Sequence, residues 1–122
     1  MIKGCFLESD KVREVPLVDR AGRRLLLKLS GSAAQKGKPK ASKINYKINK
    51  VVWGKQSNVQ DKIILIEELV FDDDRKELRF SYYTQRHKDG RWAWGQFALM
   101  VPPEDIEELL TLAREKGLMK NV

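Results

Sequence analysis

Before Pro102, hydrophobic residues recur at every second position or in short β-branched runs, and such patterns are typical of strands. No window in this part of the chain sustains the spacing of an amphipathic helix. Val12 to Val18 and Arg23 to Leu29 flank a turn-forming Asp-Arg-Ala-Gly tetrad at 19–22, which predicts an N-terminal β-hairpin. Pro16 favours a sheet edge for the first of these strands, because proline lacks the backbone N–H.

Two more strands are predicted in the middle of the chain. Ile44 to Asn49 alternates apolar with polar side chains, so we expect a half-buried strand that continues towards Trp53. The apolar run Ile63 to Ile66 has no polar face, which indicates a central strand over about Lys62 to Phe71. The aspartates at 72–74 then favour a solvated turn over a cation site, since the spacing and glycine of a calcium loop are missing.

The segment from Leu78 to Val101 predicts a second hairpin, because Asp89-Gly90 between two alternating runs favours a two-residue turn. Such a turn pairs Lys88 with Arg91 and sets which side chains share a face. The expected core face contains Leu78, Phe80, Tyr82, Thr84, Phe97, Leu99 and Val101. The opposite face contains Arg79, Ser81, Tyr83, Gln85, His87, Trp92, Trp94, Gln96, Ala98 and Met100.

One helix is predicted at the C-terminal end of the chain. Pro102-Pro103-Glu104-Asp105 suits a first helical turn, and Gly117 is placed to end the helix. Its apolar stripe consists of Ile106, Leu109, Leu110 and Ala113. We therefore expect a single α+β domain over 1–122, a twisted antiparallel sheet of about six strands that includes the N-terminal hairpin, with the helix on the Phe80, Tyr82, Phe97 and Leu99 face.

Charge is distributed very unevenly along the chain. Between Asp19 and Asp61 there are eleven lysines and arginines and no acidic residue. The rest of the chain has thirteen basic and seventeen acidic residues, so this one segment produces the net charge of +7. A field of this kind predicts a polyanionic partner, with nucleic acid the first candidate.

The basic segment and the aromatic sheet face together give a candidate binding surface. Residues 30–43 lack large apolar side chains, so we expect a mobile basic loop there. Lysines of this loop and the next strand would neutralise phosphates: Lys36, Lys38, Lys40, Lys43, Lys47, Lys50 and Lys55. Bases or sugars would contact Arg79, Tyr83, Trp92 and Trp94, and each stacked base contributes roughly 1 to 3 kcal/mol.

Plainer interpretations of the same residues stay open. The lysines can serve as a solvated surface, and tryptophans on strands are often covered by another sheet or subunit. The alternative function is therefore a protein-interaction or assembly module. In that case Trp92 and Trp94 would close a homodimer, and the basic loop would bind an acidic protein.

Catalysis is not expected from this composition. Cys5 is the only cysteine and His87 the only histidine, which excludes an intrachain disulfide and a metal site built from Cys and His ligands. No acid/base pair or nucleophile set is apparent, and no cofactor is expected. The N-terminus lacks a leader pattern and no run of eighteen apolar residues occurs, so we expect a soluble cytoplasmic protein without membrane contact.

The order of strand, Lys88-Asp89-Gly90-Arg91-Trp92, strand, Pro102-Pro103 and amphipathic helix resembles a repeat of the PUR proteins. More broadly it is similar to the Whirly-type arrangement shared with the positive-cofactor-four transcription coactivators. The resemblance covers about Ile44 to Lys116, and its local motif is Gly90-Arg91-Trp92. It implies a curved four-stranded sheet backed by a helix, dimerisation, and binding of single-stranded DNA or RNA on the sheet.

Overall fold

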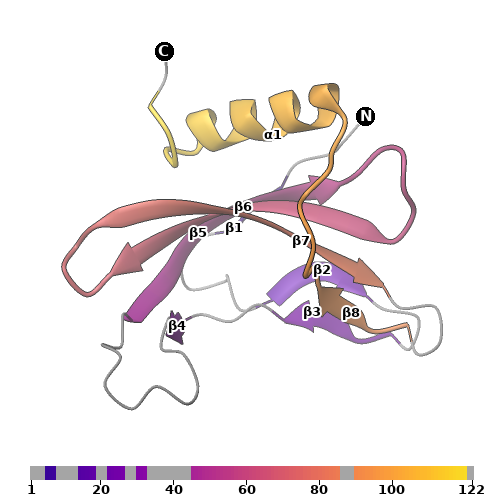
Figure 1. The fold of residues 1–122 in the computed structure, drawn as a ribbon, viewed down its shortest axis with the longest axis horizontal. Helices are drawn as coiled ribbons and strands as arrows, with labels where there is room; N and C mark the ends of the chain where they lie inside the picture. The colour runs from indigo at the N-terminus through magenta and orange to yellow at the C-terminus, as the bar shows by residue number, and fades with distance from the viewer. Residues whose placement is uncertain are drawn as a thin grey trace.

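The computed structural model describes residues 5–7, 14–18, 22–26, 30–32, 45–85 and 90–120. Within these residues the chain forms an α+β fold with a mainly antiparallel sheet and a C-terminal helix, as predicted (Figure 1). The strands are β1 (Cys5–Leu7), β2 (Glu14–Val18), β3 (Arg24–Leu26), β4 (Ser30–Ser32), β5 (Asn45–Lys55), β6 (Lys62–Phe71), β7 (Lys76–Gln85) and β8 (Trp92–Trp94), and the helix is α1 (Pro103–Glu115).

The main sheet has the strand order β1-β5-β6-β7-β8, with β4 also paired to β5. Its centre is β6, whose Ile63 to Ile66 run is buried completely, in agreement with the continuous apolar sequence. The β2–β3 hairpin is confirmed, but it forms a separate two-stranded sheet. Ser30–Ser32, expected within the mobile basic loop, instead pairs with β5, and residues 33–44 lie outside the described residues.

A bulge in β5 determines which side chains face each layer. The pairing of β5 with β6 shifts between Ile48 and Lys50, so one extra residue, Asn49, enters β5. The Asn49 side-chain amide donates a 2.7 Å hydrogen bond to the buried carboxylate of Glu68. Because the bulge reverses the alternation, Ile48 and Val51 pack into the same core although they have opposite parity.

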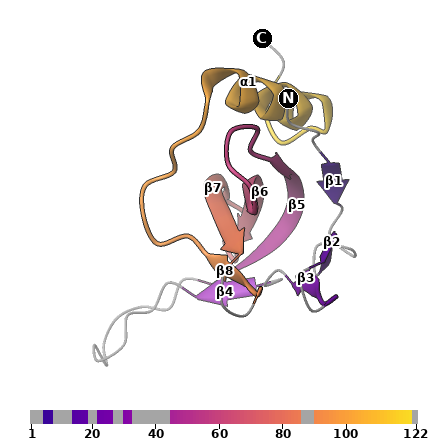
Figure 2. The same cartoon turned by 90° about the vertical axis from the view of Figure 1, so that its right-hand side faces the viewer.

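The molecule has three layers, with α1 on one side of the main sheet and the β2–β3 hairpin on the other (Figures 1 and 2). The helix-side core joins Val52, Ile64 and Ile66 of the sheet to Leu109 and Ala113 of α1. The hairpin-side core consists of Val15, Leu25, Ile48, Val51, Trp53, Ile63, Leu65 and Leu69. The sheet therefore has a hydrophobic core on each face.

The predicted ends of α1 are confirmed. Pro102 precedes the first turn, Glu104 and Asp105 lie in that turn, and Gly117 follows the last turn with a φ of +81°. Asp105 is buried, and its carboxylate accepts hydrogen bonds from the Ser57 backbone N–H at 2.8 Å and from the Ser57 hydroxyl at 2.9 Å. These two bonds attach the start of α1 to the β5–β6 turn.

The predicted register of the second hairpin is wrong. Gln85 pairs with Trp92 and Tyr83 with Trp94, two residues away from the pairing that a turn at Asp89-Gly90 would impose. Strand β8 also ends at Trp94 rather than continuing to Val101. The next residue, Gly95, donates its N–H to the Tyr82 carbonyl at 2.8 Å. A side chain at Gly95 would collide with the Tyr82 ring, so glycine is required there.

The expected core face is corrected accordingly. Tyr82, Leu99 and Val101 pack against the helix-side core, whereas Phe97 is 85% exposed and Phe80 is 45% exposed. The reason lies in a side-chain hydrogen bond: the Phe97 N–H binds the Tyr82 hydroxyl at 3.1 Å instead of a carbonyl of β7. The chain thus leaves the sheet after Gly95 and crosses to α1 as an irregular segment (Figure 1).

Candidate nucleic-acid interface

The predicted aromatic residues come together on the hairpin side of the sheet. A pocket of about 440 Å³ is lined by Leu26, Tyr46, Arg79, Tyr83 and Trp94. The rings of Tyr83 and Trp94 meet edge to face, with centroids 5.3 Å apart. The guanidinium carbon of Arg79 lies 4.9 Å from the Trp94 ring centroid and 5.4 Å from that of Tyr46. This arrangement, which we call the aromatic pocket, brings three of the predicted base-contacting residues together.

The buried carboxylate of Glu67 holds the Arg79 guanidinium in place. Its Nε and Nη2 donate to Glu67 Oε1 and Oε2 at 2.9 and 3.1 Å, and its Nη1 donates to the Tyr46 hydroxyl at 2.8 Å. Ser81 completes the network by donating its hydroxyl to Glu67 at 2.7 Å. Burial opposes the charged form of Arg79, but the hydrogen bond and negative charge of Glu67 outweigh it and raise the Arg79 pKa.

This network changes the role predicted for Arg79. Its charge is balanced within the protein by Glu67, whose carboxylate is completely buried. We therefore assign Arg79 to positioning: it fixes Trp94 and Tyr46 by cation–π contact. The acidic partner was visible in the sequence, but only the pairing of β6 with β7 places Glu67 opposite Arg79.

Tyr83 forms the boundary between the aromatic pocket and its neighbour. Burial, assisted by the charge of Glu67, raises the pKa of Tyr83 to about 12. Its phenol is consequently neutral at physiological pH and able to donate a hydrogen bond. The ring packs partly against the hairpin-side core, so one face is fixed.

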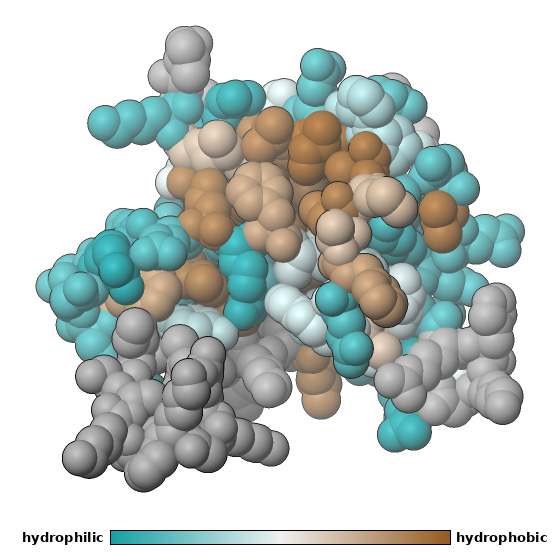
Figure 3. All heavy atoms as spheres, in the orientation of Figure 1, coloured by the Kyte–Doolittle hydropathy of each residue, from teal (hydrophilic) through white to brown (hydrophobic). Residues whose placement is uncertain are grey.

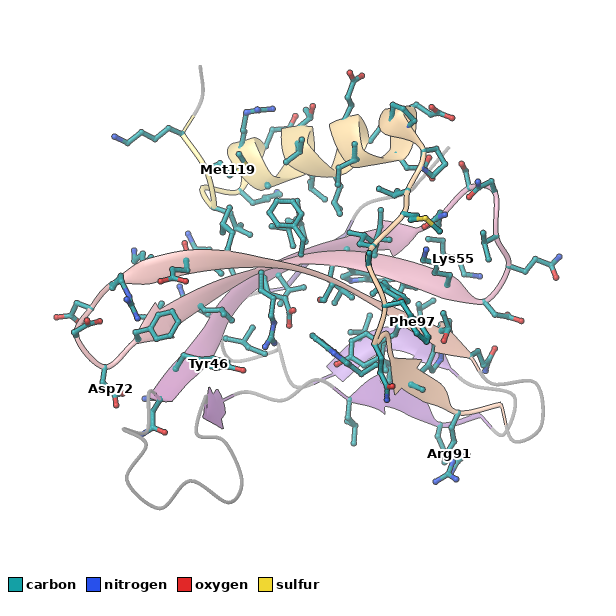
Figure 4. The ribbon with its side chains drawn as sticks, viewed as in Figure 1. Tyr46, Lys55, Asp72, Arg91, Phe97 and Met119 are labelled. Atoms are coloured by element: carbon teal, nitrogen blue, oxygen red, sulfur yellow. The ribbon has the colours of Figure 1, made fainter. Side chains whose placement is uncertain are left out.

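A second pocket of about 580 Å³ adjoins the aromatic pocket and shares Leu26 and Tyr83 with it. Arg23, Arg24 and Arg91 line it together with Trp92. Figure 4 shows the Arg91 side chain extending away from the body of the protein near β8 and the hairpin. We call this the arginine pocket. Arg23 and Arg24 come from the acid-free segment, but sequence reasoning assigned them to the hairpin alone.

Trp92 and Trp94 differ in exposure although they lie on one face. Trp94 is 43% exposed, whereas Trp92 is half-buried and packs against the hairpin-side core. The Trp92 indole N–H is buried and has no acceptor within the part of the chain that the structure describes. The sheet face predicted to be open to ligand is thus partly covered by β2 and β3.

The predicted lysines do not form one surface. Lys47 and Lys50 of β5 are linked through β6 to Lys76 and Leu78 of β7, as cross-strand neighbours on one face. This face is the helix side of the sheet. Lys55 lies in one row with Ile63, Tyr83 and Trp94, on the same side as the pockets. Lys36, Lys38, Lys40 and Lys43 fall outside the described residues, so their contribution stays a prediction.

Other candidate chemistry is sparse in the described residues. Asp72, Asp73 and Asp74 form an exposed turn, and the Asp73 carboxylate accepts the Arg75 N–H at 3.2 Å, as expected for an aspartate turn. No cluster of metal-ligating side chains occurs among the residues described, and His87 lies outside them. None of the helical residues described forms a segment long and apolar enough to cross a membrane.

Comparisons with family models, with curated proteins and with solved structures give no match for this chain, so the likeness to PUR and Whirly-type domains stays a prediction.

Proposed function

We propose that this protein binds single-stranded nucleic acid, without catalysis, along the adjoining aromatic and arginine pockets. The observation that supports this best is the shared boundary of the pockets. Leu26 and Tyr83 line both, so three arginines lie next to a partly exposed tryptophan. A phosphate on the arginine side would place an attached base near Trp94 and Tyr46.

The chemistry of each pocket fits one part of a nucleotide. Guanidinium groups match phosphate oxygens in charge and geometry, and each neutralised phosphate releases counterions. Aromatic rings accept any base by stacking, and the neutral Tyr83 hydroxyl adds a donor for a base or sugar oxygen. Pairing within a duplex keeps bases stacked and unavailable, which favours an unpaired strand.

The remaining basic residues contribute a positive electrostatic potential around the proposed binding surface. The acid-free segment draws a polyanion to this side of the chain, and Lys55, in the same row as Tyr83, extends the contact. Lys36 to Lys43 add further phosphate contacts in this proposal. A cytoplasmic location forms part of the same proposal.

The test is binding of fluorescent oligonucleotides to the full chain over a range of salt concentrations. We expect single strands to bind more tightly than duplexes of the same length, with affinity that falls linearly on a log–log plot against salt. Absence of binding at the lowest salt concentration would refute the proposal. If the Trp94→Ala variant kept full affinity, base stacking on Trp94 would be refuted, while the proposed phosphate contacts would stand.

The alternative proposal is an assembly module in which the Trp92 and Trp94 face closes a homodimer. Trp92 is already packed within its own chain, so less apolar surface remains for such an interface. The two proposals differ in tryptophan fluorescence. Nucleic acid should quench Trp94 in the first case, while in the second its emission should already be blue-shifted and unaffected by oligonucleotide.

A further inference from the structure

Strand β7 has an edge that no strand covers in the described part of the chain. Strand β8 pairs only with Tyr83, Thr84 and Gln85, and Gly95 adds a single bond to Tyr82. From Lys76 to Ser81 the side of β7 opposite β6 has no strand partner among the described residues. Such an edge presents a row of backbone donors and acceptors.

The direction of these backbone groups follows from the register. Tyr82 bonds outward to Gly95, and β7 pairs with β6 without a bulge over its whole length. Because the direction alternates along a strand, Lys76, Leu78 and Phe80 also point their N–H and C=O groups outward. The intervening residues Glu77 and Arg79 point theirs towards β6.

Apolar side chains gather beside this edge. Helix α1 packs mainly on β5 and β6; on the helix side of β7, Tyr82 and Leu78 pack against the core, whereas Phe80 stays exposed. Phe80 is 45% exposed, and Phe97 and Met100 in the nearby crossing segment are 85% and 75% exposed. Figure 3 shows apolar residues grouped on this face of the molecule, and Figure 4 places Phe97 at its front. Exposed patches of this kind beside an unpaired strand mark association surfaces.

We propose that a second copy of this chain pairs its β7 with this edge in antiparallel orientation, so that one sheet continues through a dimer. The register that we assign is centred on Leu78, which lies opposite Leu78 of the second copy. Lys76 then faces Phe80, and about six intermolecular backbone hydrogen bonds form. This interface shares Arg79 with the aromatic pocket, but its existence does not depend on the proposed function.

Charge selects both the partner and the register. With Leu78 at the centre, Glu77 of each copy, which pairs with Arg75 of its own chain at 3.2 Å, also faces Arg79 of the other copy, and opposite charges across a strand pair stabilise it. A register centred on Arg79 would bring two arginines face to face, which destabilises the pair. A register centred on Phe80 would require the Tyr82 carbonyl, which already accepts the Gly95 N–H. The edge is therefore self-complementary in one register.

The symmetry has a consequence for the pockets. A continuous antiparallel sheet has its two-fold axis perpendicular to the sheet, so corresponding faces lie on the same side. Both aromatic pockets would then lie on one face of the dimer, opposite both helices. Two nucleic-acid segments would be bound side by side on that face.

The first test measures oligomeric state by analytical ultracentrifugation without nucleic acid. We expect the wild type to be a dimer, and the Glu77→Arg variant to dissociate at least tenfold more readily because arginines then face each other. Glu107→Arg, the same charge change on an exposed part of α1, is the matched control and should leave the dimer unchanged. A wild type that is monomeric at all concentrations, or a Glu77→Arg dimer as tight as wild type, would overturn the proposal.

The second test locates the axis directly and does not depend on a destabilising change. In a Cys5→Ser background, Leu78→Cys should give a covalent dimer with a short bifunctional maleimide, whereas Thr111→Cys on exposed α1 should not. Equal cross-linking at the two positions, or none at Leu78→Cys, would contradict pairing through β7. Oligonucleotide binding is measured separately, so failure of one proposal leaves the other standing.

Discussion

The guanidinium of Arg79 and the buried carboxylate of Glu67 form a two-point ion pair across β6 and β7, with distances of 2.9 and 3.1 Å. The pair lies at the base of the aromatic pocket, with Trp94 on the guanidinium. Since Glu67 is 0% exposed, its charge depends on Arg79 and Ser81 for compensation. The pair thus links the interior of the sheet to the candidate binding surface.

Loss of this carboxylate should be costly. We expect Glu67→Gln to lower the free energy of unfolding by about 3 to 5 kcal/mol, because Arg79 then lacks its buried counter-charge. The measurement is urea denaturation at neutral pH, with Glu107→Gln on exposed α1 as the control, expected to change stability by less than about 0.5 kcal/mol. Similar small effects for both variants would show that the pair is energetically unimportant.

Gly95 should tolerate no side chain. A Cβ at this position would meet the Tyr82 ring, so Gly95→Ala must displace either the ring or the segment that crosses to α1. We expect a loss of about 1 to 3 kcal/mol in thermal or chemical unfolding. Gly95→Ala in a Tyr82→Leu background, where the ring is absent, should cost clearly less; equal costs in the two backgrounds would refute the contact.

The Tyr83 phenol should lose its proton at a higher pH than an ordinary tyrosine. Its pKa is raised to about 12, above the ordinary value of about 10. The folded state therefore disfavours the phenolate, and the stability that Tyr83 contributes is complete below pH 10 and lost as pH rises towards 12. Alkaline absorbance titration should show a phase near pH 12 that is absent in Tyr83→Phe. A titration curve that Tyr83→Phe leaves unchanged near pH 12 would contradict this.

The three tryptophans should respond differently to a soluble quencher. Trp53 is 5% exposed and Trp94 is 43% exposed, so acrylamide should reach Trp94 far more readily. We expect Trp94→Phe to remove most of the quenchable emission and most of any quenching by oligonucleotide, whereas Trp53→Phe should remove little. The reverse order would mean that Trp94 is covered in solution.

The sequence predicted elements well where the pattern was local. The buried run of β6, the N-terminal hairpin and both ends of α1 follow from apolar runs, turn residues and proline placement. The face shared by Arg79, Tyr83 and Trp94 was also predicted, because the two-residue error in register leaves the alternation of faces unchanged.

The errors arose where a side chain or a bulge overrides the pattern. Phe97 leaves the sheet because its N–H donates to the Tyr82 hydroxyl, and the spacing of apolar residues along the sequence does not predict such a bond. The bulge at Asn49 reverses the alternation of β5, so Lys47 joins Lys50 on the helix side, away from Lys55 and the pockets. Burial of the second sheet face by the β2–β3 hairpin is a long-range contact, which local spacing does not reveal. Arg23, Arg24 and Arg91 were missed for the same reason.

The central claim is that phosphates bind at the arginine pocket, and paired charge removals test it most directly. Arg24→Gln with Arg91→Gln changes the pocket, while Lys47→Gln with Lys50→Gln removes equal charge on the helix side. The measurement is the salt dependence of single-strand binding for each double variant, after confirming that both fold. We predict that the slope of log K against log salt falls by about 1 to 2 for the arginine variant and hardly changes for the lysine variant. Equal losses, or a larger loss for the lysine variant, would contradict the account.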